Sequence, residues 1–226
     1  CNLHCRMCDV GTGTLGSNFA TNLVGTKPLN MPADLLKHII DQTAETWRDT
    51  KLGYAFTEPL IYPHLLETMN YARERKIYTS VTTNALTLDK LAADISRAGL
   101  REIFVSLDGP EAVHDAIRRN TASFRRAIDG IEALLGEPAM PAISVYCVIT
   151  EWNTCRLKEL ADFLMRYPLK ALGFMHTNFT PEHVAQLHNQ RYGRSYPATS
   201  SNVAETQVEK TNLDELWREI RTIRAG

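Results

Sequence analysis

The sequence predicts an α/β protein built on a parallel sheet. Short apolar segments recur between residues 52 and 175, and each is followed by a segment whose apolar residues have helical spacing. Strands of a parallel sheet are buried on both faces and read as continuous apolar runs, whereas a helix buries one stripe. Because the crossovers between parallel strands are right-handed, repeated βα units of this kind form a barrel or a doubly wound layer.

The predicted elements alternate through most of the chain. A helix over 31–47 comes first, with leucine and isoleucine at helical spacing and Pro32 in its first turn. The expected strands cover 52–56, 77–83, 102–107, 142–149 and 171–175. Helices are expected around 65–72 and over 87–98, 123–135, 156–166 and 181–189, with a closing helix within 212–224 that Thr211 or Asn212 would cap.

Local signals indicate where some elements end. Gly99 is expected just past the helix over 87–98, and Ser123 is expected to cap the helix that Gly136 stops. Residues 9–30 are rich in Gly, Thr and Asn without periodicity, which predicts a surface loop. Residues 190–211 are polar and are expected to be mobile or inserted.

Cys1, Cys5 and Cys8 form a C-x3-C-x2-C group within the first eight residues. Thiolates hold iron–sulfur clusters, and a cubane cluster normally takes four, so three would leave one iron open to an exchangeable ligand. Structural zinc, with His4 or a distant residue as fourth ligand, is the alternative. The spacing alone leaves both metals open.

Composition narrows the class of protein. The chain has 226 residues, of which 44% are hydrophobic and 23% charged, as in ordinary globular proteins. Its formal net charge of −1 gives no reason to expect binding to nucleic acid or to an anionic membrane surface. No apolar run approaches the ~20 residues that span a bilayer. Five cysteines, three of them clustered, make a poor disulfide framework, so we expect a cytoplasmic metalloprotein.

Polar residues follow the predicted strands, where the active sites of parallel barrels lie. They occur in Phe56-Thr57-Glu58-Pro59, in Thr82-Thr83-Asn84-Ala85 and in Ser106-Leu107-Asp108-Gly109-Pro110, which leads to His114-Asp115 and Arg118. Each motif has a structural alternative: a solvated Glu58 before a proline, a turn capped by Asn84, and a turn at Asp108-Gly109-Pro110. Ile149 and His176 lie at the ends of the last two strands.

The cysteine motif, with Asn2 and Leu3 after its first cysteine, resembles that of the radical S-adenosylmethionine (SAM) enzymes. The strand-end motifs are similar to those of that family in the same order, to about Phe179. The Ser-x-Asp-Gly-Pro…His-Asp…Arg run is closest to the subgroup that carries a C-terminal SPASM domain. Two departures are visible: Met7 replaces a usual aromatic residue, and Phe56 and Thr57 replace two glycines.

The resemblance implies one radical SAM core domain over 1–226, a partial (β/α)6 barrel. The cluster loop would cover 1–30 and the βα units 52–189, and the first strand would lie upstream of Cys1. It also implies a 4Fe–4S cluster on Cys1, Cys5 and Cys8 that binds SAM, and a one-electron donor of the flavodoxin or ferredoxin type. Reductive cleavage of SAM would yield a 5′-deoxyadenosyl radical that abstracts hydrogen from a substrate.

The same resemblance implies the contacts of SAM. Glu58 would bind its amino group, Ser106 and Arg118 its carboxylate and Ile149 its adenine, with Asn84 nearby. At the mouth of the barrel, His176 is expected either to exchange a proton with the substrate or to bond a neighbouring loop. His183 and His188 are five residues apart and do not share a helical face, so no second metal site is expected.

The sequence does not decide whether the substrate is a peptide or a small molecule. Two other functions compete with radical chemistry. One is a non-catalytic zinc or iron–sulfur binding module. The other is a non-radical barrel that acts on a phosphorylated metabolite, but the sequence lacks the phosphate-binding glycine loop that this would require after the last strands.

Overall fold

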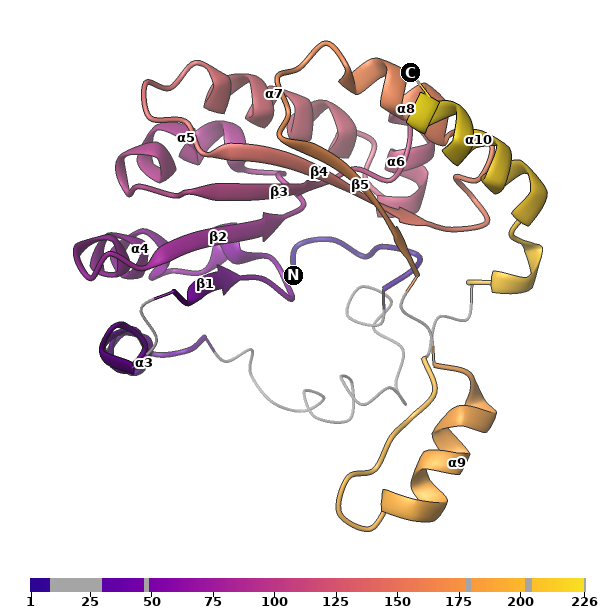
Figure 1. The fold of residues 1–226 in the computed structure, drawn as a ribbon, viewed down its shortest axis with the longest axis horizontal. Coiled ribbons are helices and arrows are strands. Elements are labelled where there is room, and N and C mark those ends of the chain that lie inside the picture. Colours follow the sequence, from indigo (N-terminus) through magenta and orange to yellow (C-terminus); the bar gives the residue numbers. More distant parts are fainter. Residues whose placement is uncertain (9–29, 47–48, 178–179, 202–204, 226) are drawn as a thin grey trace.

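The computed structural model describes residues 1–8, 30–46, 49–177, 180–201 and 205–225. Its five strands are β1 (Lys51–Tyr54), β2 (Tyr78–Thr83), β3 (Glu102–Ser106), β4 (Ala142–Ile149) and β5 (Ala171–His176). They form one parallel sheet in chain order, each strand paired with the next. A doubly wound sheet reverses its order at a switch point. A strand order without such a reversal is therefore that of a barrel wall. Figure 1 shows that the sheet is curved and open.

The helices alternate with the strands as predicted, with small differences at their ends. They are α3 (Ala33–Thr46), α4 (Leu65–Glu74), α5 (Leu88–Arg97), α6 (Glu111–Arg118), α7 (Ser123–Leu135), α8 (Leu157–Leu164), α9 (Glu182–Tyr192) and α10 (Leu213–Ala225). Helices α5, α7 and α8 lie along the outer side of the sheet, whereas α9 projects away from it (Figure 1). Helix α6 was not predicted. None of the helices in the described ranges is long and apolar enough to cross a membrane.

The core lies between the sheet and its outer helices. Val81, Ile103 and Val145 of the central strands are completely or almost completely buried, as are large apolar residues of α5, α7 and α8. Helices α5 and α7 approach closely at Gly130, where a Cβ would lie 2.6 Å from the Cβ of Leu88. A glycine is thus needed for this packing, which holds the β2, β3 and β4 units in one layer.

Three of the predicted helix ends are confirmed and one is wrong. Helix α7 ends at Leu135, and Gly136 is its C-cap. Gly99 follows α5 with φ of +78°, and the Asn212 side chain accepts a bond from the Glu215 amide in the first turn of α10. Ser123, however, does not cap α7: Ala122 is the capping residue and makes no side-chain bond. The Ser123 hydroxyl instead lies 2.9 Å from Nε2 of the buried His114, which makes it part of a tertiary network.

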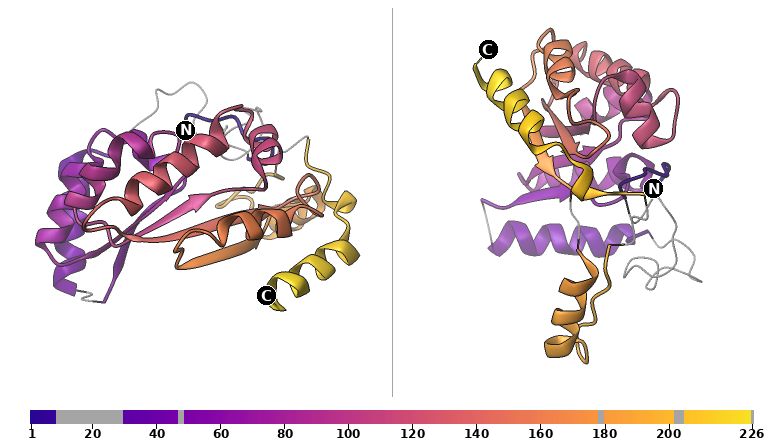
Figure 2. Two further views of the ribbon diagram at one scale, coloured as in Figure 1. Left: turned by 90° about the horizontal axis from the view of Figure 1, so that it is seen from above. Right: turned by 90° about the vertical axis from the view of Figure 1, so that its right-hand side faces the viewer.

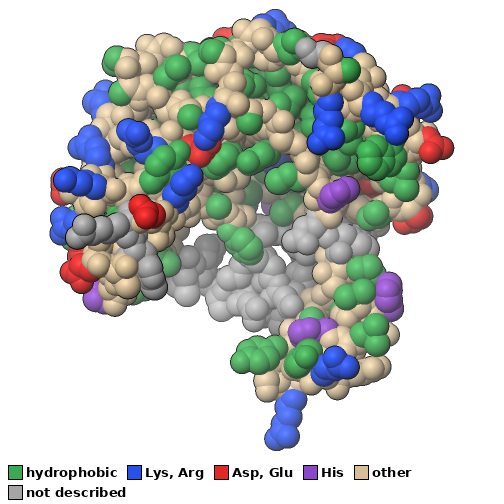
Figure 3. Space-filling model, in the orientation of Figure 1, with side chains coloured by type: hydrophobic (Ala, Val, Ile, Leu, Met, Phe, Trp, Pro, Cys, Tyr) green, Lys and Arg blue, Asp and Glu red, His purple; other side chains and the backbone are tan. Residues whose placement is uncertain are grey.

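The segment of residues 1–8 lies beside the carboxyl ends of the strands, as Figure 1 and the right-hand view of Figure 2 show. The Arg6 amide donates to the carbonyl of Ile117 at 2.9 Å, which joins this segment to α6. Most of the predicted loop after it lies outside the described residues. The face shown in Figure 3 has acidic side chains among the basic ones, in keeping with the near-neutral net charge.

Candidate active site

The cysteine segment packs through its middle cysteine. Cys5 is buried with Leu3 and Leu86, and Cys8 packs against this small cluster, whereas Cys1 is exposed. The thiols of all three cysteines are free. Burial raises the pKa of the Cys5 thiol, and the nearby charge of Arg118 opposes part of that rise.

The donor chemistry of this segment fits an iron–sulfur cluster, since three free thiols lie within one short segment. Two of them already share one apolar environment. Among the residues that the structure describes, no three His, Cys, Asp or Glu side chains converge as a finished metal site. The three thiols would therefore have to converge when a cluster binds, and the ligand set stays a prediction.

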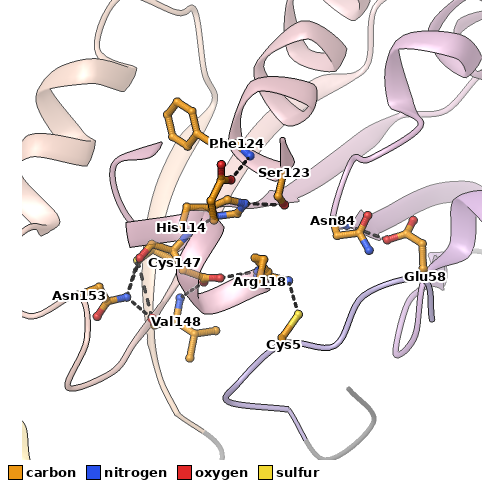
Figure 4. Close-up of polar contacts among 12 residues, drawn as sticks. Cys5, Glu58, Asn84, His114, Arg118, Ser123, Phe124, Cys147, Val148 and Asn153 are labelled. Carbon is orange, nitrogen blue, oxygen red and sulfur yellow. Dashed lines mark hydrogen bonds and ion pairs between the residues drawn. The ribbon is translucent and has the colours of Figure 1, made fainter. Parts of the chain in front are cut away.

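Glu58, after β1, is not the solvated residue of the structural alternative: it is only 2% exposed. One carboxylate oxygen accepts bonds from the Leu60 amide at 3.0 Å and the Thr83 hydroxyl at 2.6 Å. The other accepts from the Asn84 amide at 2.8 Å (Figure 4). Burial raises the pKa of this carboxyl group, and its hydrogen bonds oppose the rise. A carboxylate offers about four acceptor positions, so three bonds leave Oε2 able to accept another.

Asn84, after β2, connects the strand ends to the cysteine segment. Its side-chain nitrogen donates to Oδ1 of Asn2 at 2.8 Å, and its Oδ1 accepts from the Leu86 amide at 3.1 Å. The same residue therefore closes the turn and contacts the neighbour of Cys1. The next residue, Ala85, has φ of +61°, a left-handed conformation that favours glycine.

A buried network follows β3. Asp108 is fully buried and binds the guanidinium of Arg118, with 2.6 Å between Oδ2 and Nε. Its Oδ1 accepts from the Val148 amide of β4 at 3.1 Å, and its own amide donates to Nδ1 of His114 at 3.0 Å. The turn in Asp108-Gly109-Pro110 therefore also anchors α6 to β4 (Figure 4).

Protonation states in this network follow from burial. Burial lowers the pKa of His114 to about 3, so its ring is neutral, with Nδ1 as acceptor and Nε2 free to donate to Ser123. Burial alone would also lower the pKa of Arg118, but the charges of Asp108 and Cys5 raise it, so the guanidinium stays charged.

Asn153 holds the far end of the network. It is fully buried, and its amide nitrogen donates to the carbonyls of Asp108 at 2.9 Å and Val148 at 2.7 Å. Its Oδ1 accepts from the Thr150 amide at 2.8 Å. Sequence reasoning missed this role of Asn153, and the only signal for it is its position shortly after an apolar strand.

Arg118, which was predicted to bind the carboxylate of SAM, points toward the cysteines. Its Nη1 lies 3.7 Å from Sγ of Cys5, and the residue is only 8% exposed. Ser106, its predicted partner, is half-buried at the end of β3. Both assignments to the SAM carboxylate stay predictions.

Ile149 and His176 are paired across β4 and β5. Ile149 is buried, and its carbonyl accepts a bond from the Thr177 hydroxyl at 2.5 Å. His176 ends β5 and is exposed. His188, by contrast, is part of α9, which projects away from the sheet, and its Nε2 lies 2.7 Å from the Tyr196 carbonyl.

A charged cluster that sequence reasoning missed covers the cysteine segment. Glu205 binds both Arg6, at 2.9 Å, and Arg119. The guanidinium of Arg6 also lies 4.1 Å from the ring centre of Trp152. Because Glu205 falls in the polar stretch that was predicted to be mobile or inserted, nothing in the sequence pointed to this contact. It connects a distant segment to the loop between two cysteines.

This arrangement of cysteines and strand ends agrees with a family comparison. Residues 1–164 match the model of the Radical SAM superfamily. The chain belongs to the radical SAM superfamily. This confirms the predicted family and enzyme class, and with them the cofactors of that family, a 4Fe–4S cluster and SAM.

Individual relatives are similar over most of this chain. The mycofactocin maturase MftC of Mycolicibacterium smegmatis is 26% identical over 74% of the chain, and the serine-type anaerobic sulfatase-maturating enzyme of Bacteroides thetaiotaomicron is 28% identical over 77%. Among solved structures, Streptococcus suis SuiB bound to S-adenosylmethionine matches 99% of the chain with a TM-score of 0.67 and 16% identity. This likeness confirms the partial barrel fold.

The chain spans only part of these proteins: 40% of the length of MftC, 40% of the sulfatase-maturating enzyme and 44% of the SuiB chain. Phe56, which the resemblance placed at a glycine of the family motif, has φ of +90°, a conformation that glycine adopts most readily.

Proposed function

We propose that this chain is the core of an enzyme that cleaves SAM reductively and abstracts hydrogen from a peptide substrate. The observation that carries the proposal is the placement of the cysteine segment against the strand ends. Asn2 bonds Asn84 after β2, and Cys5 contacts Arg118 beside the end of β3. The residues of the cysteine motif and of two strand-end motifs therefore meet at one edge of the sheet (Figure 4).

Within this site, Cys1, Cys5 and Cys8 would hold the cluster. A bound cluster and SAM would supply a 5′-deoxyadenosyl radical, given one electron from a donor of the flavodoxin or ferredoxin type. The protein's own part is to orient SAM and exclude water. Oε2 of Glu58 can accept a bond from the amino group of SAM, Ser106 can bond its carboxylate, and buried Ile149 offers apolar surface to the adenine.

A peptide is the favoured substrate because of the SPASM-like motif at Ser106–Pro110 and because of the relatives. SuiB has been solved with the precursor peptide SuiA bound, and anSMEcpe with bound SAM and a peptide. The carboxyl end of β5, with exposed His176, is the side of the mouth that we assign to this substrate.

The reaction can be tested by anaerobic reconstitution with iron and sulfide, followed by addition of dithionite and SAM. We expect formation of methionine and 5′-deoxyadenosine, measured by chromatography and mass spectrometry. Cys5→Ala should abolish both products. Cys147→Ala, which removes a buried thiol inside β4, is the matched control and should retain them. A reconstituted cluster that leaves SAM intact would contradict the proposal.

A further inference from the structure

We propose that Arg118 is a positioning residue for the cluster: it donates a hydrogen bond to the Cys5 thiolate and so raises the reduction potential of the cluster bound there. This inference rests on the proposed function, because it takes Cys5 as a cluster ligand. It assigns to Arg118 a role different from the SAM carboxylate contact that the sequence motif suggested.

The geometry commits the guanidinium to two partners inside the protein. Its Nε faces Asp108 at 2.6 Å and its Nη1 faces Cys5 Sγ at 3.7 Å, within the range of hydrogen bonds to sulfur. The Arg118 side chain is 10% exposed and that of Asp108 fully buried. Little of the guanidinium therefore remains exposed to bind a ligand.

The surrounding network fixes this orientation. Asp108 is held by the amide of Val148, by His114 and, through its carbonyl, by Asn153. Arg118 itself is the last residue of α6, whose Ile117 carbonyl accepts the Arg6 amide of the cysteine segment. The backbone bond between Ile117 and Arg6 thus lies next to both Arg118 and Cys5, and it holds the donor near its sulfur acceptor.

The effect on the cluster follows from charge. Hydrogen bonds to cluster sulfurs are one of the means by which a protein sets the reduction potential. Reduction adds one electron, and a donor to the thiolate stabilises the more negative, reduced cluster. A bond from a charged group in a buried site is stronger than a neutral one in water. The bond from Arg118 therefore makes the cluster easier to reduce.

The test is the midpoint potential of the reconstituted cluster without SAM, measured by an EPR-monitored redox titration. The main variant is Arg118→Met combined with Asp108→Asn, which removes the donor without leaving a buried charge unpaired. We expect a more negative midpoint potential than in the wild type. Arg118→Lys is the second variant, for use if the double variant fails to fold. It keeps the charge but not the two-sided fork of the guanidinium, and it should shift the potential in the same direction.

Arg125→Met is the control, because it removes the same charge from an exposed ion pair on α7 and should leave the potential unchanged. SAM affinity is measured in parallel. If the variants keep the wild-type potential, the inference is wrong, and a simultaneous loss of SAM affinity would return Arg118 to the carboxylate role. A wild-type protein that forms a cluster and cleaves SAM in the same series keeps the proposed function intact in either case.

Discussion

The two sides of the strand-end edge differ in how their polar groups are held. After β3 and β4, Asp108, Arg118, His114 and Asn153 are buried and bonded to one another and to the backbone. After β5, His176 is exposed. The first side faces the cysteine segment, and the second is the side that we assign to the substrate.

This difference separates two kinds of requirement. A cluster and the SAM bound to it need protein groups that are held in one geometry, and a dense buried network supplies that rigidity. A substrate must enter and leave, so the residues that meet it need access to solvent. Buried networks are also costly to damage, whereas exposed residues are not. Variants on the two sides should therefore differ first in stability and then in the step of the reaction that they affect.

The largest expected effect comes from Asp108→Ala. It would leave the guanidinium of Arg118 buried without its ion-pair partner, which costs about 3–5 kcal/mol. Chemical denaturation gives the free energy of unfolding. Asp94→Ala, which breaks an exposed pair with Arg97, is the matched control and should change it by about 0.5 kcal/mol or less. Equal effects from the two variants would show that the network after β3 is not structurally special.

Glu58→Gln should weaken SAM binding by about ten- to a hundredfold, because it removes the charge that would bind the amino group, worth roughly 1.5–3 kcal/mol. The absorption spectrum of the cluster should not change. Isothermal titration of SAM into the anaerobic protein measures the affinity. Glu67→Gln on α4, an exposed glutamate, is the control, and wild-type affinity in Glu58→Gln would remove Glu58 from the SAM site.

Buried His114 should make stability depend on pH. Its pKa of about 3 in the folded state lies below the unfolded value of 6.5, so between these values the unfolded chain binds more protons. Stability should fall as the pH drops below 6.5, by up to about 1.4 kcal/mol per pH unit. The slope should become shallower in His114→Gln, measured by denaturation across pH 4–7. An unchanged slope in that variant would contradict a neutral, buried His114.

The smallest effect on stability is expected for His176→Ala, about 0.5 kcal/mol or less, because the side chain is exposed. If His176 serves the substrate, SAM cleavage should persist while formation of product from the peptide is lost. Separate assays of 5′-deoxyadenosine and of modified peptide make the distinction. Wild-type levels of both would mean that the residue has no part in the reaction.

Much of the fold follows from local patterns. The strands are apolar because they are buried on both faces, and the bounds of β4 and α7 match the sequence prediction. Helix α6 was missed because its sequence also reads as a turn followed by isolated motif residues. Ser123 was taken for a cap because serine often caps helices, but a buried histidine nine positions away uses its hydroxyl.

The site was predictable as a set of residue types at strand ends, but not as a network. Asp108, His114 and Arg118 stand in one motif, yet their bonds depend on how α6 folds back over β4. The contact between Arg6 and Glu205 joins residues 199 positions apart, and surface charges give no sign of such a pairing. Local sequence identifies the groups, and tertiary packing decides which of them remain open to ligands.

The account depends most on what Cys1, Cys5 and Cys8 bind, and metal analysis after anaerobic reconstitution tests this most directly. We expect about four irons with matching sulfide per chain, and absorption near ~400 nm that is sensitive to oxygen. Loss of any one of the three thiols should abolish the cluster, whereas Cys147→Ala should retain it. Stoichiometric zinc without sulfide in the wild-type protein would contradict the account.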